Sequence, residues 1–280
     1  RPTLTFEVFP PKTDDKYETV KFAAEKIAAL KPDYMSVTYG AGGGTSDYTV
    51  SVAADILNNY NVTPLAHLTC VSSDKQKITA QLKALKDNNI ENILALRGDI
   101  PKNSNNSAEE YKYAAQLIRD IKSMGDFCIG GACYPETHVE SSTSAEDIKY
   151  LKEKVDTGCD FLTTQMFFDN NILYSFLYKI REAGITVPVV AGIMPVTNGK
   201  QIKRICELSG TYLPQRFKSI VDKFGSDPAA MTQAGVAYAT DQIIDLLANG
   251  VNAIHVYSMN KPEVAAAIQA NLSKIIPKKD

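Results

Sequence analysis

The feature that most constrains the fold is a regular alternation of two kinds of segment along the chain. Eight short runs rich in β-branched and aromatic residues recur, and longer stretches with helical spacing of apolar residues separate them. Strands joined by such long crossovers pair in parallel, so the pattern predicts a parallel sheet covered by helices. The predicted strands are residues 4–9, 34–39, 64–69, 92–97, 127–134, 161–167, 187–193 and 252–257.

Three of the intervening segments carry clear helix signals. Residues 17–30 and 75–88 place apolar side chains at helical spacing, and residues 144–158 begin with serine and end with glycine, as a capped helix does. Residues 206–248 form a stretch longer than one strand–helix unit needs. An extra helix is therefore predicted before the last strand.

Eight strand–helix units in a chain of 280 residues are typical of an α/β protein of the (β/α)8 TIM-barrel class, with residues 1–280 forming a single domain. A doubly wound open sheet is the structural alternative. The GxGxxG signature that many such sheets carry does not follow the first strand. A hydrophobic content of 44% with 22% charged residues predicts a sizeable core.

Composition also argues against several classes of function. A net charge of −2 gives no reason to expect a nucleic-acid or membrane partner, and no apolar run is long enough to span a bilayer. The five cysteines form no CxxC pair, and the three histidines form no HExxH motif. We therefore expect reduced thiols, a cytoplasmic location and no metal site.

The segment TFEVFPPK places an acid, Glu7, inside an apolar strand, between Phe6 and Val8. Burying a carboxylate costs free energy unless other groups compensate for it. Glu7 is therefore either one half of a structural ion pair or a functional acid. In a TIM barrel the carboxyl ends of the strands carry the active site, so the ends of the other strands bear on this choice.

Polar side chains follow most of the predicted strands. Each has a structural explanation when taken singly: His67 as a core histidine, Asp147 and Lys154 as a solvated charge stripe on one helix face, and GAGGGT as a tight loop. Their convergence at one barrel mouth predicts a site for a large ligand that forms many hydrogen bonds.

Seven motifs occur in order at the predicted strand ends: FEVFPPK, SVTYGAGG, ALRGD, YPETH, TTQMFFD, GIMPV and HVYSMN. Together they resemble methylenetetrahydrofolate reductase of the short bacterial type, from Phe6 to about Leu272. The resemblance implies a flavin-bearing TIM barrel that reduces 5,10-methylenetetrahydrofolate to 5-methyltetrahydrofolate, a reaction of one-carbon metabolism and methionine biosynthesis. It also implies that hydride passes from NADH or NADPH through FAD in a ping-pong reaction.

The resemblance assigns roles to residues that match the family motifs. Glu7 matches the general acid that protonates the departing nitrogen of the methylene bridge, and apolar neighbours would favour its protonated form. Asp99 matches an aspartate near flavin and pterin, whose charge would disfavour an anionic reduced flavin. The positions that match FAD contacts are Thr38, His67, Arg97, Gly98, Asp99, Ala114, Tyr134, His138, Asp147 and Lys154. The positions that match substrate contacts are Glu7, Asp99, Gln165, Gln201, Tyr257 and Lys261.

Within the FAD set, the resemblance places Asp147 on a ribose hydroxyl and Lys154 beside the pyrophosphate. Three positions depart from the enterobacterial pattern. Gly199 and Ile205 stand where that pattern has aromatic residues, and Glu153 stands where it has a basic residue near the FAD phosphates. These departures bear on the nicotinamide and phosphate contacts and leave the general acid unchanged.

Two competing functions stay open. One is another flavin barrel of the same superfamily, such as a proline dehydrogenase, although the combination of ALRGD with TTQMFFD argues against it. The other is a non-catalytic barrel that binds folate without turning it over, which the retained Glu7 argues against. For the reductase interpretation, we expect a homo-oligomer with methylenetetrahydrofolate and NADH or NADPH as small-molecule substrates.

Overall fold

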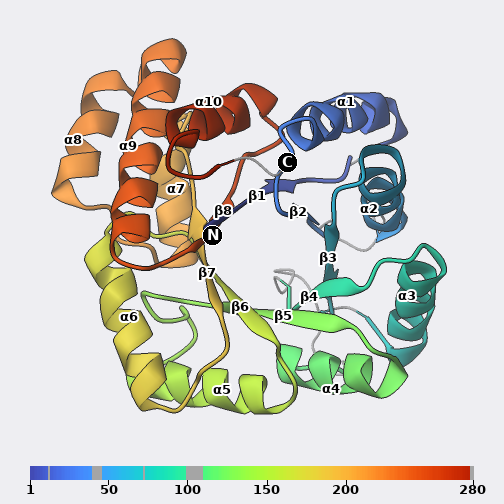
Figure 1. The fold of residues 1–280 in the computed structure, drawn as a ribbon. Helices are drawn as coiled ribbons and strands as arrows, with labels where there is room; N and C mark the ends of the chain where they lie inside the picture. The colour runs from blue at the N-terminus through green and yellow to red at the C-terminus, as the bar shows by residue number, and fades with distance from the viewer. Residues whose placement is uncertain (12, 40–45, 72, 99–109, 278–280) are drawn as a thin grey trace.

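The computed structural model describes residues 1–11, 13–39, 46–71, 73–98 and 110–277. Its strands form a closed parallel barrel in the order β1 to β8, and the helices surround this ring (Figure 1). The strands are β1 (Thr3–Val8), β2 (Met35–Val37), β3 (Pro64–Thr69), β4 (Asn92–Leu96), β5 (Cys128–Cys133), β6 (Phe161–Thr164), β7 (Val189–Ile193) and β8 (Ala253–Val256). The predicted TIM barrel is therefore confirmed.

The helices follow the strands around the outside of the ring (Figure 1). They are α1 (Tyr17–Ala28), α2 (Ser46–Tyr60), α3 (Lys75–Asp87), α4 (Ala114–Met124), α5 (Ser144–Asp156), α6 (Asn170–Glu182), α7 (Gly199–Ser209), α8 (Gln215–Phe224), α9 (Pro228–Ala248) and α10 (Pro262–Leu272), with a 3-10 helix η1 (Asp14–Lys16) before α1. The three helices predicted from local signals correspond to α1, α3 and α5 within two residues at each end.

Six of the strands are shorter than predicted, and β2 and β6 lose the most, three residues each. β6 stops at Thr164, although the backbone N–H of Gln165 still donates to the carbonyl of Cys133 at 2.8 Å. Beyond it, the side chain of Gln165 accepts the backbone N–H of Met166 at 3.0 Å. β2 stops at Val37, although the backbone N–H of Thr38 still donates to the carbonyl of Val8 at 3.0 Å. Polar residues at these two positions therefore lie on the loops above the ring.

Strand β1 is hydrogen-bonded to β8 on one side and to β2 on the other, which closes the barrel. The register sets Thr5 beside His255 and Glu7 beside Ser36. Because side chains alternate along a strand, Thr5 and Glu7 share the inward face, while Phe6 lies in the core between the sheet and the helices. The acid that interrupts the apolar run thus points into the barrel.

The predicted extra helical structure before β8 is confirmed, as α7, α8 and α9 all lie between β7 and β8. These helices have a small core of their own, in which Phe217 stacks on Phe168 with ring centroids 5.0 Å apart and packs on Tyr238 at 4.3 Å. The side chain of Tyr238 donates to the carbonyl of Phe168 at 2.6 Å. This second core fixes the three helices to the end of β6.

Helix α9 packs its backbone directly on the connection that follows β7, at Gly235. A Cβ atom at this position would lie 1.9 Å from the carbonyl oxygen of Val196. Glycine to alanine within a helix ordinarily stabilises by about 1 kcal/mol. We expect Gly235→Ala to lower the free energy of unfolding by about 2 kcal/mol or more, because the helix must move away from the strand connection.

Urea denaturation measures this change. The matched control is Ala237→Gly at an exposed position of the same helix, which should cost about 1 kcal/mol through helix propensity only. A Gly235→Ala protein as stable as the parent would contradict the close contact with Val196.

Candidate active site

Two adjoining cavities lie at the carboxyl ends of the strands. The inner cavity has a volume of about 180 Å³ and reaches down to Glu7. The outer cleft has a volume of about 1080 Å³ and extends over the β3–β5 side of the ring toward α4 and α5. His67 and Tyr134 line both, so the two spaces share a wall.

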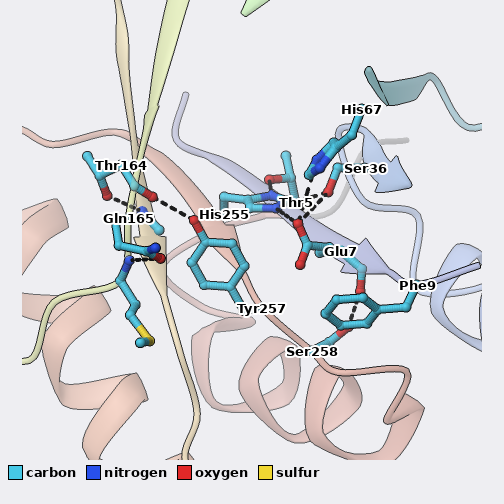
Figure 2. A network of polar contacts seen from close by, with 12 residues as sticks. Thr5, Glu7, Phe9, Ser36, His67, Thr164, Gln165, His255, Tyr257 and Ser258 are labelled. Carbon is cyan, nitrogen blue, oxygen red and sulfur yellow. Dashed lines mark hydrogen bonds and ion pairs between the residues drawn. The ribbon is translucent and has the colours of Figure 1, made fainter. Parts of the chain in front are cut away.

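The carboxyl group of Glu7 lies at the base of the inner cavity, with the residue only 6% exposed. Its Oε2 atom lies 3.4 Å from the hydroxyl of Ser36, 3.6 Å from Nε2 of His67 and 3.8 Å from Nε2 of His255 (Figure 2). All three neighbours stand on different strands. No lysine or arginine among the described residues forms an ion pair with Glu7, so the interpretation as half of a basic structural pair is not supported there.

His255 is fixed by hydrogen bonds to both ring nitrogens. The hydroxyl of Thr5 donates to the carbonyl of Ile254 at 3.0 Å and lies 2.7 Å from Nδ1 of His255. Both contacts are satisfied only when His255 carries its proton on Nδ1 and donates to Thr5. Nε2 of His255 lies 3.1 Å from the hydroxyl of Ser36, which holds the imidazole beside Glu7.

Burial lowers the pKa of His67 to about 4, although the charge of Glu7 opposes the shift and His255 adds to it. His67 is therefore neutral near pH 7. Its Nε2 atom is buried without a hydrogen-bond partner among the described residues. The hydroxyl of Thr163, on the opposite side of the inner cavity, is also buried and unpartnered there. Two such atoms facing one cavity indicate that a ligand with hydrogen-bonding groups belongs in it.

Gln165 and Tyr257 line the inner cavity from β6 and β8 (Figure 2). The amide oxygen of Gln165 accepts the backbone N–H of Met166, which leaves its NH₂ group available as a donor. The hydroxyl of Tyr257 donates to the carbonyl of Thr164 at 2.6 Å, and burial raises the pKa of this hydroxyl well above its ordinary value. Tyr257 therefore stays protonated and presents its ring to the cavity.

The outer cleft brings together every described residue that the sequence matched to FAD contacts. These residues are Thr38, His67, Arg97, Gly98, Ala114, Tyr134, His138, Asp147 and Lys154. They come from six different elements and strand–helix connections, so only the fold makes them neighbours. Their contact with a cofactor stays a prediction.

Asp147 and Lys154 already have partners within the protein. The carboxylate of Asp147 accepts the backbone N–H of His138 at 3.2 Å and the hydroxyl of Ser141 at 3.0 Å, and so shapes the loop after β5. The ammonium of Lys154 donates to the carbonyl of Ala132 at 2.6 Å. Burial lowers the pKa of Lys154, and the thiol of Cys133 is the first of the groups that oppose the shift. Both side chains keep some capacity for a ligand, since a carboxylate accepts about four bonds and an ammonium donates three.

Arg97 and Glu140 form a bidentate ion pair within the cleft, with nitrogen–oxygen distances of 2.5 and 2.7 Å. The Arg97 guanidinium lowers the pKa of Glu140. Burial lowers the pKa of His138, against the opposing charge of Glu140. Nδ1 of His138 accepts the backbone N–H of Glu140 at 3.2 Å, so its Nε2 carries the proton and is a donor.

Two predicted substrate contacts do not reach either cavity. Gln201 lies on an exposed position of α7. Lys261 donates to the hydroxyl of Thr197 at 2.6 Å and is not among the lining residues. Asp99 lies outside the described residues.

The structure shows the surroundings of the three residues that depart from the enterobacterial pattern. A Cβ atom on Gly199 would lie 2.5 Å from Cα of Gly225, so the start of α7 abuts the end of α8 and leaves no room for an aromatic side chain. Ile205 packs against the second core. Glu153 lines the outer cleft, which adds an acid where a base was expected.

The sequence interpretation missed Thr5, Ser36 and Thr163 and gave His255 no role. Two signals were available. Thr5 stands two residues before Glu7 on the same inward face, and His255 was already placed on the last strand. The pairing of β1 with both β2 and β8 was needed to see that these residues meet.

Within the described residues, no group of three or more His, Cys, Asp or Glu side chains is placed to hold a metal ion. In the same part of the chain, no helix has the length and apolar character that crossing a membrane requires.

The fold and the paired cavities define a TIM barrel with a ligand site built around a buried acid. A family model described as methylenetetrahydrofolate reductase matches residues 1–273. The chain belongs to this family. The 5,10-methylenetetrahydrofolate reductase of Pectobacterium carotovorum is 34% identical over 96% of this chain and 89% of its own length. The Escherichia coli protein of the same name is 33% identical over 95% of this chain and 88% of its own length.

Plant relatives are longer. Methylenetetrahydrofolate reductase (NADH) 1 of Zea mays is 34% identical, and the match covers 98% of this chain but 49% of the maize protein. The chain thus spans about half the length of the plant relatives that it matches. Among solved structures, an uncharacterised protein from Clostridium thermocellum that binds two copies of 5-methyl-5,6,7,8-tetrahydrofolic acid aligns with a TM-score of 0.66 at 14% identity. It covers 98% of this chain and 96% of its own chain, and it supports the fold only.

The buried neutral histidine makes stability depend on pH. The pKa of His67 is about 4 in the folded protein and 6.5 in an exposed histidine, so the unfolded chain binds the proton more tightly. The contribution of His67 to the free energy of unfolding is therefore fully present above about pH 6.5. It is lost as the pH falls toward 4, by roughly 3 kcal/mol at most. Urea unfolding at about pH 7 and about pH 4.5 should show a smaller difference for His67→Gln than for the parent protein. An equal pH dependence in both would show that His67 titrates normally.

Proposed function

We propose that the protein is a flavin-dependent oxidoreductase that reduces 5,10-methylenetetrahydrofolate to 5-methyltetrahydrofolate with NADH or NADPH as hydride donor through FAD. The observation that carries the proposal is the position of Glu7. A buried carboxyl lies at the base of a small cavity, directly beside a cleft whose volume is at the upper end for small-molecule sites. Membership of the family supports the reaction, and the site supports its chemistry.

The residues present fit a flavin. His67 and His138 line the outer cleft, and Nε2 of His138 is a donor, as a planar heterocycle with polar edges requires. Gly98 has a positive φ of 88°, and a Cβ atom there would lie 2.7 Å from the side chain of Val71, so only glycine fits this turn beside the cleft. FAD held here would supply the hydride transfer from the reduced nicotinamide to the folate.

Glu7 supplies the proton that the reaction needs. Opening the methylene bridge breaks a carbon–nitrogen bond, and a proton on the departing nitrogen makes that nitrogen a better leaving group. The carbon left as an iminium then accepts hydride and becomes the methyl group. One proton from Glu7 and one hydride balance the reduction. Solvent then reprotonates the Glu7 carboxylate before the next turnover.

The surroundings of Glu7 hold the carboxyl in place for this step. Ser36, His67 and His255 all contact one carboxyl oxygen, Oε2, and no contact of the other oxygen with these residues is drawn (Figure 2). The NH₂ group of Gln165 is a donor in the same cavity and is suited to a carbonyl or ring nitrogen of the pterin. Asp99, Gln201 and Lys261 keep the roles predicted for them by the resemblance, as part of this proposal.

Colour and bleaching test the function. The purified protein should carry flavin absorption that NADH or NADPH bleaches under anaerobic conditions, and methylenetetrahydrofolate should restore the colour with formation of 5-methyltetrahydrofolate. Restoration by proline-derived imine instead of folate would point to the proline dehydrogenase reaction. Protein that binds 5-methyltetrahydrofolate but no flavin would establish the non-catalytic alternative.

A substitution at Glu7 should slow only one of the two half-reactions, because only folate reduction requires a proton donor. Glu7→Gln should leave flavin reduction by nicotinamide within a few-fold of the parent rate and slow folate reduction by ~10²-fold or more. Stopped-flow absorbance of each half-reaction is the measurement. The control is Glu136→Gln, which changes another partly buried acid of the barrel mouth that accepts the backbone N–H of Tyr212. Equal slowing of both halves in Glu7→Gln would show a structural role.

A further inference from the structure

A chain of hydroxyl and imidazole groups connects Glu7 to the interior of the barrel. The Ser36 hydroxyl lies 3.4 Å from Oε2 of Glu7 and 3.1 Å from Nε2 of His255 (Figure 2). On the other side of the imidazole ring, Nδ1 of His255 lies 2.7 Å from the Thr5 hydroxyl. These residues come from the neighbouring strands β1, β2 and β8, and none of them is more than 6% exposed. A proton can therefore pass between the acid and the imidazole along contacts that the fold has already formed.

Thr5 determines which nitrogen of His255 takes part. The Thr5 hydroxyl donates to the carbonyl of Ile254 at 3.0 Å, so its single proton is used and its oxygen accepts from Nδ1. Nδ1 therefore keeps its proton whether the ring is neutral or charged. Nε2, which faces Ser36 and Glu7, is left as the nitrogen that gains and loses a proton.

The Ser36 hydroxyl allows two arrangements of one exchangeable proton. When that proton is on Glu7, the carboxyl donates to the Ser36 oxygen, and the Ser36 hydroxyl donates to Nε2 of His255. When it is on Nε2, the imidazolium donates to the Ser36 oxygen, and the Ser36 hydroxyl donates to the carboxylate. Each donor of these three side chains has an acceptor in both states, so neither state leaves a buried donor without a partner.

Few neighbouring groups compete for this proton near pH 7. Burial lowers the pKa of His67, on β3, to about 4, and it raises the pKa of Tyr34, whose ring stacks on the imidazole, to about 12. Burial also raises the pKa of Tyr257, after β8, well above its ordinary value. Tyr134 is the remaining titratable neighbour in the described lining of the inner cavity, which includes no lysine or arginine. The exchangeable proton therefore belongs to the carboxyl and the imidazole.

We propose that His255 is a positioning residue for the general acid and shares one exchangeable proton with Glu7 through the Ser36 hydroxyl. The inference rests on the proposed function, since it assigns a proton partner to the acid of that reaction. After Glu7 has protonated the departing nitrogen, Nε2 of His255 takes up a proton from solvent. That proton moves to the Ser36 oxygen as the Ser36 proton moves to Oε2 of Glu7, which leaves the imidazole neutral and the carboxyl protonated. A proton shared by two sites is lost at a higher pH than a proton held by one, so folate reduction persists to a higher pH.

The pH dependence of folate reduction, measured by stopped-flow on the reduced, flavin-loaded protein, tests the shared proton. His255→Asn leaves Glu7 as the only holder, so the rate should fall at a pH about 1 unit lower than in the parent, the scale of one lost charge partner. Thr5→Val should shift the profile in the same direction, because the imidazole proton then moves to Nε2 and stabilises the carboxylate. Thr5→Ser keeps the hydroxyl and should restore the parent profile. Flavin reduction by nicotinamide should stay within a few-fold of the parent rate in all three variants.

The matched control is Thr240→Val. Thr240 is a buried threonine of α9 whose hydroxyl donates to the carbonyl of Val236 at 2.8 Å, and it lines neither cavity. This substitution should lower the free energy of unfolding without moving the pH profile. A merely structural role of Thr5 would give the same result in Thr5→Val.

Nitrogen-15 NMR of labelled histidine tests the same proposal without turnover. The chain has three histidines, so single substitutions assign each ring. Nδ1 of His255 should stay protonated throughout a pH titration of the parent, whereas Thr5→Val should place the proton of the neutral ring on Nε2. In Glu7→Gln, Nε2 should lose its proton at a pH about 1 unit lower than in the parent, because the imidazolium no longer faces a carboxylate.

A pH profile that does not move in Thr5→Val, or a His255 titration that is the same in the parent and in Glu7→Gln, would overturn the shared proton. Either result leaves the proposed function intact as long as the parent reduces methylenetetrahydrofolate. A parent protein that does not reduce it would overturn the proposed function instead. The NMR titration would then still decide the inference: a shift in Glu7→Gln supports a proton shared between the two side chains, and no shift overturns it.

Discussion

The closure of the barrel between its first and last strands is the constraint on which the rest of the structure depends. The backbone N–H of Thr3 donates to the carbonyl of Asn252 at 2.7 Å, and the ladder continues with Thr5 beside His255. This pairing satisfies the backbone groups that would otherwise form two exposed edges. It also brings His255, from the far end of the chain, within 3.8 Å of Glu7. The acid is tolerated inside the ring because closure surrounds it with polar side chains.

The two cavities are distinct spaces that share one wall. The inner one ends at the acid, and the outer one runs over the strand ends toward α4 and α5. His67 and Tyr134 form part of both walls, so ligands bound in the two cavities would meet there. Because His67 is neutral near pH 7, this shared wall offers hydrogen bonds without adding charge between the two cavities.

The sequence predicted the parts of the structure that depend on local pattern. Alternation of strand and helix signals defined the barrel, and polar residues at strand ends identified the lining of the outer cleft. Contacts that depend on the register between distant strands were not accessible. The link from Thr5 through His255 to Glu7 is of this kind. The internal partners of Asp147 were also hidden, because they depend on the conformation of one loop.

The ion pair between Arg97 and Glu140 has a consequence for how an anionic ligand enters the cleft. The guanidinium is already neutralised by a carboxylate at 2.5 and 2.7 Å, so mobile counterions have little reason to gather on it. A phosphate bound at Arg97 would have to take the place of Glu140, so it would exchange one anion for another and release few ions to the bulk. Its free energy of binding at this arginine would therefore depend only weakly on ionic strength. The same carboxylate would weaken the attraction of the cleft for anions at long range.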